Sequence, residues 1–223
     1  MQLTVILVEP KHPEHVGAAA RALKTMGFNH LRLVGEPLHE AKAATILAHG
    51  AGDILNAASC HDSLAQAVSD QDFIIGTTAK LRHHRRYCFE PQALAQNLAA
   101  KQGSVQHCAL VFGREDRGLA NDEIALCDAL TRVPLAADYP SLNLAQAVMV
   151  YAYALSGLAA AEKPARRAPD QYRSLVPKLE RLLTSAGIES SEKTYKWALE
   201  RLAQGSTEDI KFLHFICEKL LNR

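Results

Sequence analysis

The sequence predicts an α/β protein built on a parallel sheet with helices on both faces. Apolar, strand-like runs alternate with stretches of helical spacing through the first 161 residues, as in chains of β-α-β units. Glycine-containing polar segments follow several of these runs, at the edge where parallel sheets bind ligands. The remaining residues carry helical spacing only.

The alternation begins at the amino terminus. We expect a strand over Leu3–Val8 and then a helix from about Pro13, because proline suits a first helical turn. Gly27 suits the end of that helix. A strand over Leu31–Val34 and a helix over Glu40–Ala48 form the next pair.

The same alternation continues to the end of this region. Asn121 and Ser141 are the expected caps of two helices, since short polar side chains satisfy the first free backbone N–H groups. The further predicted elements are helix Asp62–Ser69, strand Phe73–Thr77, helix Pro91–Lys101, strand Ala109–Phe112, helix Asn121–Cys127, strand Leu130–Leu135 and helix Ser141–Ala161.

A break in the pattern follows at Glu162–Asp170, where two prolines and mixed charge are typical of a linker. Helical spacing resumes over Tyr172–Ser185, Glu192–Ala203 and Thr207–Leu221. The expected organisation is a domain over 1–161, a linker over 162–171 and a small helical extension over 172–223.

Composition bounds the function. A net charge of +1 gives no general argument for nucleic-acid binding, so such a function has to rest on local patches. The five cysteines are scattered without a Cys-x-x-Cys pair, which predicts a reducing compartment and neither a disulfide framework nor a zinc site. The amino terminus lacks the features of a signal peptide. The cytoplasm is therefore the expected location.

One uncharged stretch, between Asp138 and Glu162, is long enough to cross a bilayer. It is rich in alanine and contains Gln146, Tyr151 and Tyr153, which weaken its transfer into lipid. A helix buried within the fold and a subunit interface explains it better, so no membrane contact is expected.

Three short runs that lie at or just beyond predicted strand ends suggest a site: Val16–Arg21, Phe112–Gly118 and Pro140–Ala145. Taken one at a time, the runs have ordinary explanations: a surface arginine for the first, a solvated loop for the second and a helix cap for the third. The convergence of the three runs at one edge of the sheet favours an enzyme or a ligand-binding protein. NAD, FAD and P-loop fingerprints are missing. His12 and His15 lack the further ligands of a metal site, so no metal is expected.

The densest positive segment lies directly after the strand 73–77. It contains Lys80, Arg82, Arg85 and Arg86, which suit contacts to a phosphate backbone, and Tyr87 is available for stacking. A solvated basic loop is the alternative.

Taken together, these runs resemble the motifs of the SPOUT superfamily of RNA methyltransferases, specifically the ribose 2′-O-methylating TrmH/TrmJ type. The matching segments stand in order, namely Gly17–Phe28, Val111–Glu115 with Gly118 and Leu119, and Ser141–Val148. The resemblance covers residues 1 to about 161, and the helical tail is similar in placement to that of TrmJ-like proteins. It implies a trefoil knot at the carboxyl end of the sheet and a homodimer with its site near the subunit interface.

The resemblance also implies S-adenosylmethionine as cofactor, RNA as substrate (tRNA more than rRNA) and no metal. By position, the cofactor would touch Thr77, Thr78, Ala79, Gly113, Val133, Pro134 and Leu142. The catalytic positions of the family fall on Arg21, Glu115, Ser141 and Asn143. Arg82 falls near the position of a family arginine that contacts RNA. Arginine essentially never deprotonates in proteins. Arg21 is therefore expected to stabilise the developing alkoxide and clamp the adjacent phosphate, while Ser141 and Asn143 orient the hydroxyl.

One position departs from the family pattern. His15 stands two residues before the first-motif glycine, where the family usually has asparagine. Histidine can hydrogen-bond RNA or hold the loop, and its charge responds to pH. The alternatives left open are an RNA-binding protein with a SPOUT pocket but little or no turnover, an rRNA 2′-O-methyltransferase, and a small-molecule-binding α/β module. Retention of all four catalytic positions argues against the two that lack turnover.

Overall fold

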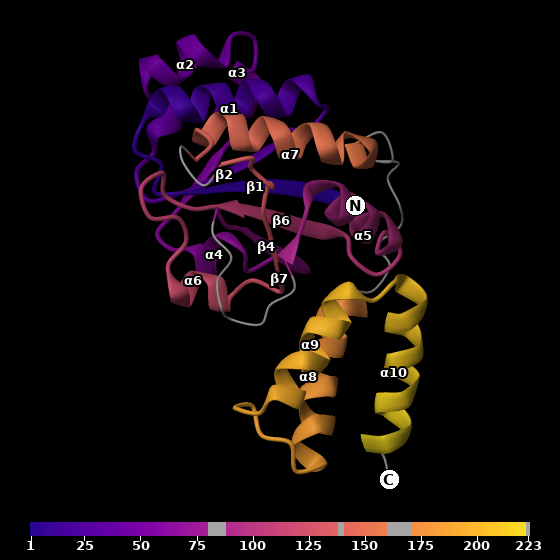
Figure 1. Cartoon of the computed structure of the whole chain (residues 1–223). Coiled ribbons are helices and arrows are strands. Elements are labelled where there is room, and N and C mark those ends of the chain that lie inside the picture. Colours follow the sequence, from indigo (N-terminus) through magenta and orange to yellow (C-terminus); the bar gives the residue numbers. More distant parts are fainter. Residues whose placement is uncertain (80–87, 138–140, 160–170, 222–223) are drawn as a thin grey trace.

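A seven-stranded sheet lies at the centre of the fold, and its neighbouring strands run parallel throughout the described residues. The computed structural model describes residues 1–79, 88–137, 141–159 and 171–221. The strand order is β3-β2-β1-β6-β4-β7-β5 (Figure 1). The strands are β1 (Gln2–Val8), β2 (His30–Val34), β3 (Ser59–His61), β4 (Phe73–Thr77), β5 (Cys88–Phe89), β6 (His107–Phe112) and β7 (Ala129–Thr131). The predicted α/β class with a parallel sheet is confirmed.

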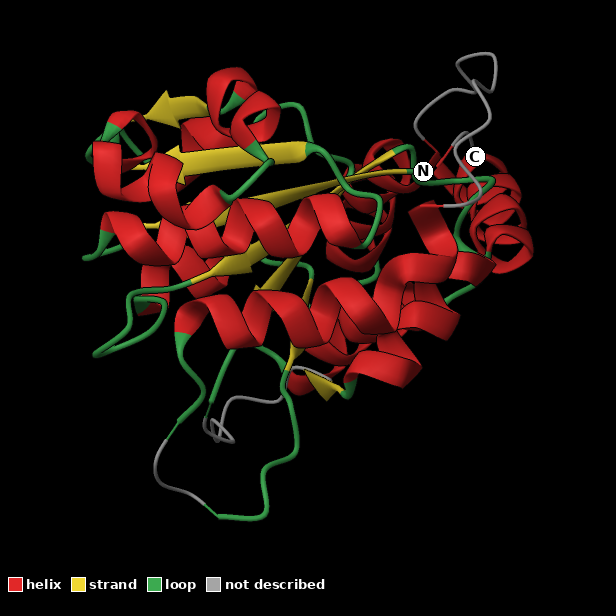
Figure 2. Ribbon diagram, turned by 90° about the horizontal axis from the view of Figure 1, so that it is seen from above, coloured by secondary structure: helices red, strands yellow, loops and turns green. Residues whose placement is uncertain are grey.

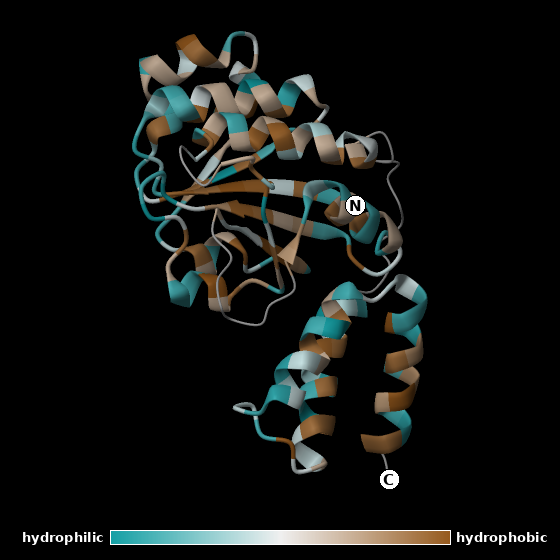
Figure 3. Ribbon diagram, viewed as in Figure 1, coloured by the Kyte–Doolittle hydropathy of each residue, from teal (hydrophilic) through white to brown (hydrophobic). Residues whose placement is uncertain are grey.

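Helices cover both faces because each strand sends alternate apolar side chains to opposite sides. In β1, Leu3, Val5 and Leu7 enter one core while Ile6 and Val8 enter the other. The central strands β1 and β6 are mostly apolar (Figure 3). The first core lies under α1 (Pro13–Thr25), α2 (Lys42–Ala48), α3 (Gly52–Ala57), α5 (Pro91–Ala100) and α7 (Leu144–Ala159), and Figure 2 views the sheet from this side. The second lies over α4 (Leu64–Ala67) and α6 (Asn121–Ala125) (Figure 1).

The first-motif glycine serves the packing of two helices. Gly17 is buried in α1, and a Cβ there would collide with the backbone oxygen of Ala44 in α2. Because that oxygen belongs to the main chain, the neighbour cannot move aside cheaply. Close contact between α1 and α2 therefore explains why this position is glycine.

The structure differs from the prediction where elements are short. The expected helix over 40–48 divides into a 3-10 turn (Leu38–Glu40) and α2, and α3, β3 and β5 were not predicted, since such short segments carry too little periodicity. The last strand ends at Thr131 and not at Leu135. Pro134 lacks the N–H that a longer ladder would need.

Both predicted helix caps are wrong by one or two positions. Asn143, not Ser141, caps α7, since its Oδ1 accepts the N–H of Ala145 at 2.9 Å. The residue before α6 is Ala120, whose N–H donates to the carboxylate of Glu123 at 2.7 Å. In both helices a side chain three residues further on accepts the N–H of the capping residue, as in a capping box.

Three helices follow in the carboxyl-terminal part of the described chain, each within one residue of its predicted bounds: α8 (Gln171–Ser185), α9 (Lys193–Gln204) and α10 (Thr207–Leu221). They pack against the end of the sheet at which the strands begin. The ring of Tyr172 meets that of Phe73 edge to face at 5.0 Å, and Thr207 Oγ1 donates to the carbonyl of Ala100 at 3.1 Å. Among the described residues, no helix has the length and apolarity needed to cross a lipid bilayer.

A buried lysine joins this extension to the sheet. Lys101 is fully buried, and its Nζ donates to the carbonyl of Gly205 between α9 and α10. Nζ also lies 5.5 Å and 5.7 Å from the ring centres of Phe73 and Tyr172. Burial disfavours the ammonium form, and nearby carboxylates offset this only in part. The pKa of Lys101 therefore falls from 10.5 to about 8.

This lysine makes stability depend on pH in a defined direction. With a pKa of about 8 when folded and 10.5 when unfolded, the cost of burying the charge is fully present below pH 8 and disappears as pH rises to 10.5. Denaturant titrations across that window should show the wild type gaining about 3 kcal/mol relative to Lys101→Met. The exposed Lys211→Met is the control, for which the difference should stay constant. A flat difference for Lys101→Met would contradict this expectation.

Candidate active site

Side chains from three distant segments meet beyond the carboxyl ends of β1 and β6. His15 lies in the first turn of α1, Glu115 in the loop after β6, and Asn143 directly before α7. Glu115 Oε1 lies 3.1 Å from His15 Nδ1, and His15 Nε2 lies 2.7 Å from Asn143 Nδ2. Two predicted site residues, Glu115 and Asn143, are thus brought together with His15 between them.

Glu115 is held as a carboxylate. Its side chain is 18% exposed, and its two oxygens each lie 3.2 Å from the backbone nitrogen of Lys11, which donates to them. Burial opposes ionisation, but hydrogen bonds from His15 and from the backbone N–H groups of Glu115 and Lys11 outweigh it. The pKa of Glu115 is therefore below its ordinary value. This group supplies a fixed negative charge at neutral pH.

Arg114 fixes the loop that carries Glu115. Its guanidinium donates to both oxygens of Glu123 in α6, at 2.9 Å and 3.0 Å, and its Nε donates to Glu9 at 2.7 Å. These hydrogen bonds lower the pKa of Glu9 and raise that of Arg114. Glu9 has a φ of 43°, an unusual value for a residue with a side chain. Because Arg114 is paired with Glu9 and Glu123, it is not available to bind a phosphate of the substrate.

Gly113 and Gly118 shape this same loop. A Cβ on Gly113 would collide with the backbone of Gly118 and Leu119, because a β-bridge between Arg114 and Gly118 folds the loop back. Gly118 has a φ of 70°, which glycine adopts without strain. The group that approaches Gly113 closely is thus the backbone of the same loop and not a ligand.

Two predicted catalytic residues are not joined to this cluster. Arg21 is exposed on α1, six residues after His15, which places it about 120° around the helix axis. Ser141 is exposed before α7. Within the described ranges, neither side chain has a hydrogen bond to Glu115, His15 or Asn143.

The residues predicted to bind the cofactor lie at the carboxyl ends of β4, β6 and β7 and just before α7. Thr77 Oγ1 donates to the carbonyl of Val111 at 3.0 Å, and the N–H of Thr78 donates to that of Thr131 at 2.9 Å, so these strand ends adjoin. Ala79 and Pro134 are exposed, whereas the others are half-buried: Thr77, Thr78, Gly113, Val133 and Leu142. Uncharged side chains with neighbouring backbone groups fit the adenosine part of a nucleoside ligand.

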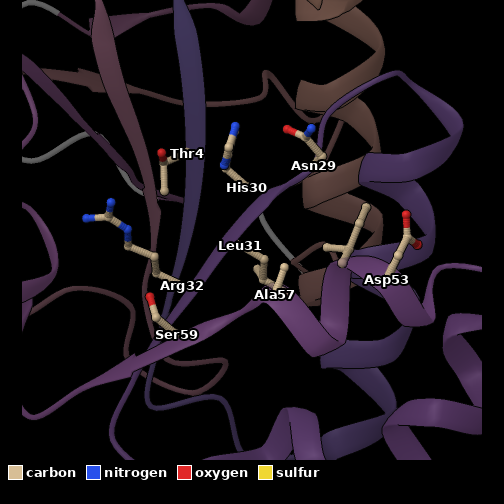
Figure 4. A pocket seen from close by; sticks show the side chains of 9 residues that line it. Thr4, Asn29, His30, Leu31, Arg32, Asp53, Ala57 and Ser59 are labelled. Carbon is tan, nitrogen blue, oxygen red and sulfur yellow. The ribbon is translucent and has the colours of Figure 1, made fainter.

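The predicted RNA-binding residues Lys80, Arg82, Arg85 and Arg86 lie outside the described residues. In the described part, no three histidine, cysteine or acidic side chains are grouped to hold a metal ion. A recess at the amino ends of β1, β2 and β3 is lined by polar side chains that include Thr4, His30 and Arg32 (Figure 4). Arg32 there pairs with Asp70 at 2.6 Å and 2.8 Å. This recess is at the opposite ends of the strands from the predicted motifs.

Sequence reasoning missed Glu9 and Glu123 and treated His15 only as a departure. The available signals were positional, since Glu9 directly follows β1 and Glu123 stands three residues after Ala120. Neither signal names Arg114 as the partner, because the contact between Glu9 and Arg114 spans 105 positions of the chain.

Comparisons with known proteins identify the family of the chain. The SpoU rRNA Methylase family matches residues 2–153, and the C-terminal domain of the tRNA/rRNA methyltransferase LasT matches residues 169–223. The chain is 43% identical over 216 residues to an Escherichia coli (strain K12) protein described as an uncharacterized tRNA/rRNA methyltransferase LasT, covering 96% of this chain and 95% of that one.

More distant relatives have named activities. TrmJ of Methanocaldococcus jannaschii, a tRNA (cytidine-2′-O-)-methyltransferase, is 36% identical over 156 residues, covering 69% of this chain and 66% of that one. The crystal structure of TrmJ from Z. mobilis ZM4 aligns with a TM-score of 0.64 at 27% identity and covers 99% of both chains. Because a family model matches more than half of its length, the chain belongs to the SpoU rRNA methylase family.

Proposed function

We propose that this protein is an S-adenosylmethionine-dependent methyltransferase that acts on a ribose 2′-hydroxyl of RNA, with tRNA as substrate. The observation that carries the proposal is the meeting of Glu115 and Asn143 through His15 in a chain of the SpoU family. Relatives named as tRNA 2′-O-methyltransferases favour tRNA over rRNA. A protein that only binds RNA has no need of so closely held a pair, which favours the enzyme.

S-adenosylmethionine, when bound, would supply an electrophilic methyl group on its sulfonium. The residues that would hold it are those at the strand ends: Thr77, Thr78, Ala79, Gly113, Val133, Pro134 and Leu142. The ends of β4 and β7, which carry several of these residues, are held together by the backbone hydrogen bond from Thr78 to Thr131. A neutral, half-buried edge of this kind suits an adenine, whose ring edge pairs with backbone groups.

The residues of the chain have to place the ribose hydroxyl in line and ease the loss of its proton. We assign the orientation of the hydroxyl to Ser141 and Asn143, with Glu115 as the carboxylate that holds the cluster. Arginine essentially never deprotonates in proteins, so Arg21 is not the base. Its role is to stabilise the developing alkoxide and to clamp the neighbouring phosphate.

A homodimer would complete the site. Arg21 is exposed on α1, which packs against both α2 and α7 (Figure 1). Apolar side chains stand exposed on these two helices: Ile46 at 59% and Leu47 at 40% on α2, and Tyr153 at 71% on α7. Covering them with a second copy would remove apolar surface from water. The same interface would bring Arg21 of one subunit close to Glu115, His15 and Asn143 of the other.

We further propose that residues 1–161 form the methyltransferase domain, knotted at its carboxyl end, followed by a linker over 162–171 and an extension over 172–223. The family matches to 2–153 and 169–223 support these boundaries. Lys80, Arg82, Arg85 and Arg86 follow β4 in the sequence and would contact phosphates of the RNA. We place the protein in the cytoplasm with its tRNA substrate.

Cofactor binding should stabilise the folded protein. At about a hundred times its dissociation constant, S-adenosylmethionine should add about 2.7 kcal/mol to the free energy of unfolding, and ATP and NAD should add nothing comparable. Thermal unfolding measures this. Leu142→Arg should remove the effect, whereas Leu220→Arg, on the exposed surface of α10, should retain it. If neither S-adenosylmethionine nor its demethylated product shifts the transition, the pocket is wrongly assigned.

Arg21→Ala should separate catalysis from cofactor binding. We expect methyl transfer to tRNA to fall about a hundredfold or more, because a contact to the developing negative charge is lost. Calorimetry should give a cofactor dissociation constant close to wild type. Lys24→Ala is the control, since Lys24 is another exposed cation on α1 and pairs with Asp53 at 2.7 Å. Retained activity in Arg21→Ala would exclude this role.

Mixed dimers test whether Arg21 serves the other subunit. Subunits carrying Arg21→Ala and Asn143→Ala should each be inactive alone. If Arg21 acts across the interface, each heterodimer contains one intact site, and random mixing should restore about a quarter of wild-type activity. No recovery after verified subunit exchange would place Arg21 in the site of its own chain.

A further inference from the structure

The amide of Asn143 is held in one orientation by the start of α7. Its Oδ1 accepts the N–H of Ala145 at 2.9 Å, and its backbone N–H donates to Gln146 Oε1 at 3.1 Å. Because the helix uses the oxygen end of the amide, the Nδ2 end faces His15. An amide nitrogen donates hydrogen bonds and does not accept them. Turning the amide over would therefore break the cap of α7.

These partners determine where the ring of His15 carries its hydrogen. Nε2, 2.7 Å from Asn143 Nδ2, has to accept a hydrogen bond. Nδ1, 3.1 Å from Glu115 Oε1, has to donate one, because an ionised carboxylate only accepts. A neutral ring protonated at Nδ1 satisfies both contacts. The other tautomer and the imidazolium would each set an N–H of the ring against an N–H of Asn143.

We propose that His15, as a neutral ring protonated at Nδ1, is a positioning residue that holds the amide of Asn143 and the carboxylate of Glu115 in one geometry for methyl transfer. The catalytic part rests on the proposed function, whereas the tautomer rests on the hydrogen bonds alone. The ring joins partners that lie 100 and 128 positions away in the chain. An asparagine at position 15 would present an atom near Nδ1 but none near Nε2, so histidine provides a connection that the residue usual in the family lacks.

The tautomer is tested on the wild-type protein. Two-bond nitrogen–proton correlation spectra of 15N-histidine-labelled protein at neutral pH should show one ring with a protonated Nδ1 and an unprotonated Nε2. Comparison with His15→Ala assigns this ring. A His15 ring protonated at Nε2, or at both nitrogens, would overturn the proposal whatever the enzyme activity.

Kinetics of three variants test the positioning role. Glutamine at position 15 keeps an acceptor near Nε2, asparagine keeps a donor near Nδ1, and alanine keeps neither. With S-adenosylmethionine and unfractionated tRNA, kcat should fall about tenfold or more in His15→Ala and less in His15→Gln and His15→Asn. The KM for tRNA and the Kd for the cofactor should stay within about twofold of wild type.

The matched control is His12→Ala in the turn before. The ring of His12 packs edge-on against His15 at 5.1 Å, and within the described ranges it has no hydrogen bond to Glu115 or Asn143. It should keep the kcat and unfolding temperature of the wild type. Wild-type kcat in His15→Ala, or a raised KM for tRNA with unchanged kcat, would overturn the positioning role. Failure of the wild type to methylate either tRNA or rRNA would contradict the proposed function, and the ring spectrum would still decide the tautomer.

Discussion

The pairing of β1 with β6 is the constraint on which the site depends. In this register Leu7 lies opposite Phe112, so the segments that follow the two strands emerge side by side. Glu9 meets Arg114, and Lys11 meets Glu115, for this reason. A slip of one residue would turn the side chains of β1 to the opposite faces and separate these partners. Because both faces of β1 are buried under helices, the register is strongly specified.

Elements with a long apolar pattern could be predicted from the sequence, and elements defined by their partners could not. β4 and α10 have the predicted bounds because β4 is a continuous apolar run and α10 has apolar residues at regular helical spacing, each between clear breaks. β5 has two residues and no pattern of its own. It is a strand because the carbonyl of Phe89 accepts hydrogen bonds from Thr131 Oγ1 and from the backbone N–H of Arg132.

The same distinction applies to the site. Glu115 and Asn143 stand in local motifs and could be named from the sequence, but their connection through His15 depends on sheet order. The cap of α7 could have been predicted, since serine and asparagine are both good capping residues. Gln146 lies three positions after Asn143 and not after Ser141, and this spacing favours the observed cap. The pairing of Glu9 and Glu123 with Arg114 could not be predicted, because the two carboxylates come from different elements of the fold.

The order of the strands also bears on how the chain folds during its synthesis. β1 leaves the ribosome well before β6 and α7, yet Lys11 contacts a residue 104 positions later and His15 one 128 positions later. Parallel pairings across such long loops form slowly, because the entropy of closing the loop has to be overcome first. Until β6 emerges, β1 can pair with β2 alone. The nascent chain therefore presents an open, apolar strand edge through much of its translation, a stage at which chaperones would protect it from aggregation.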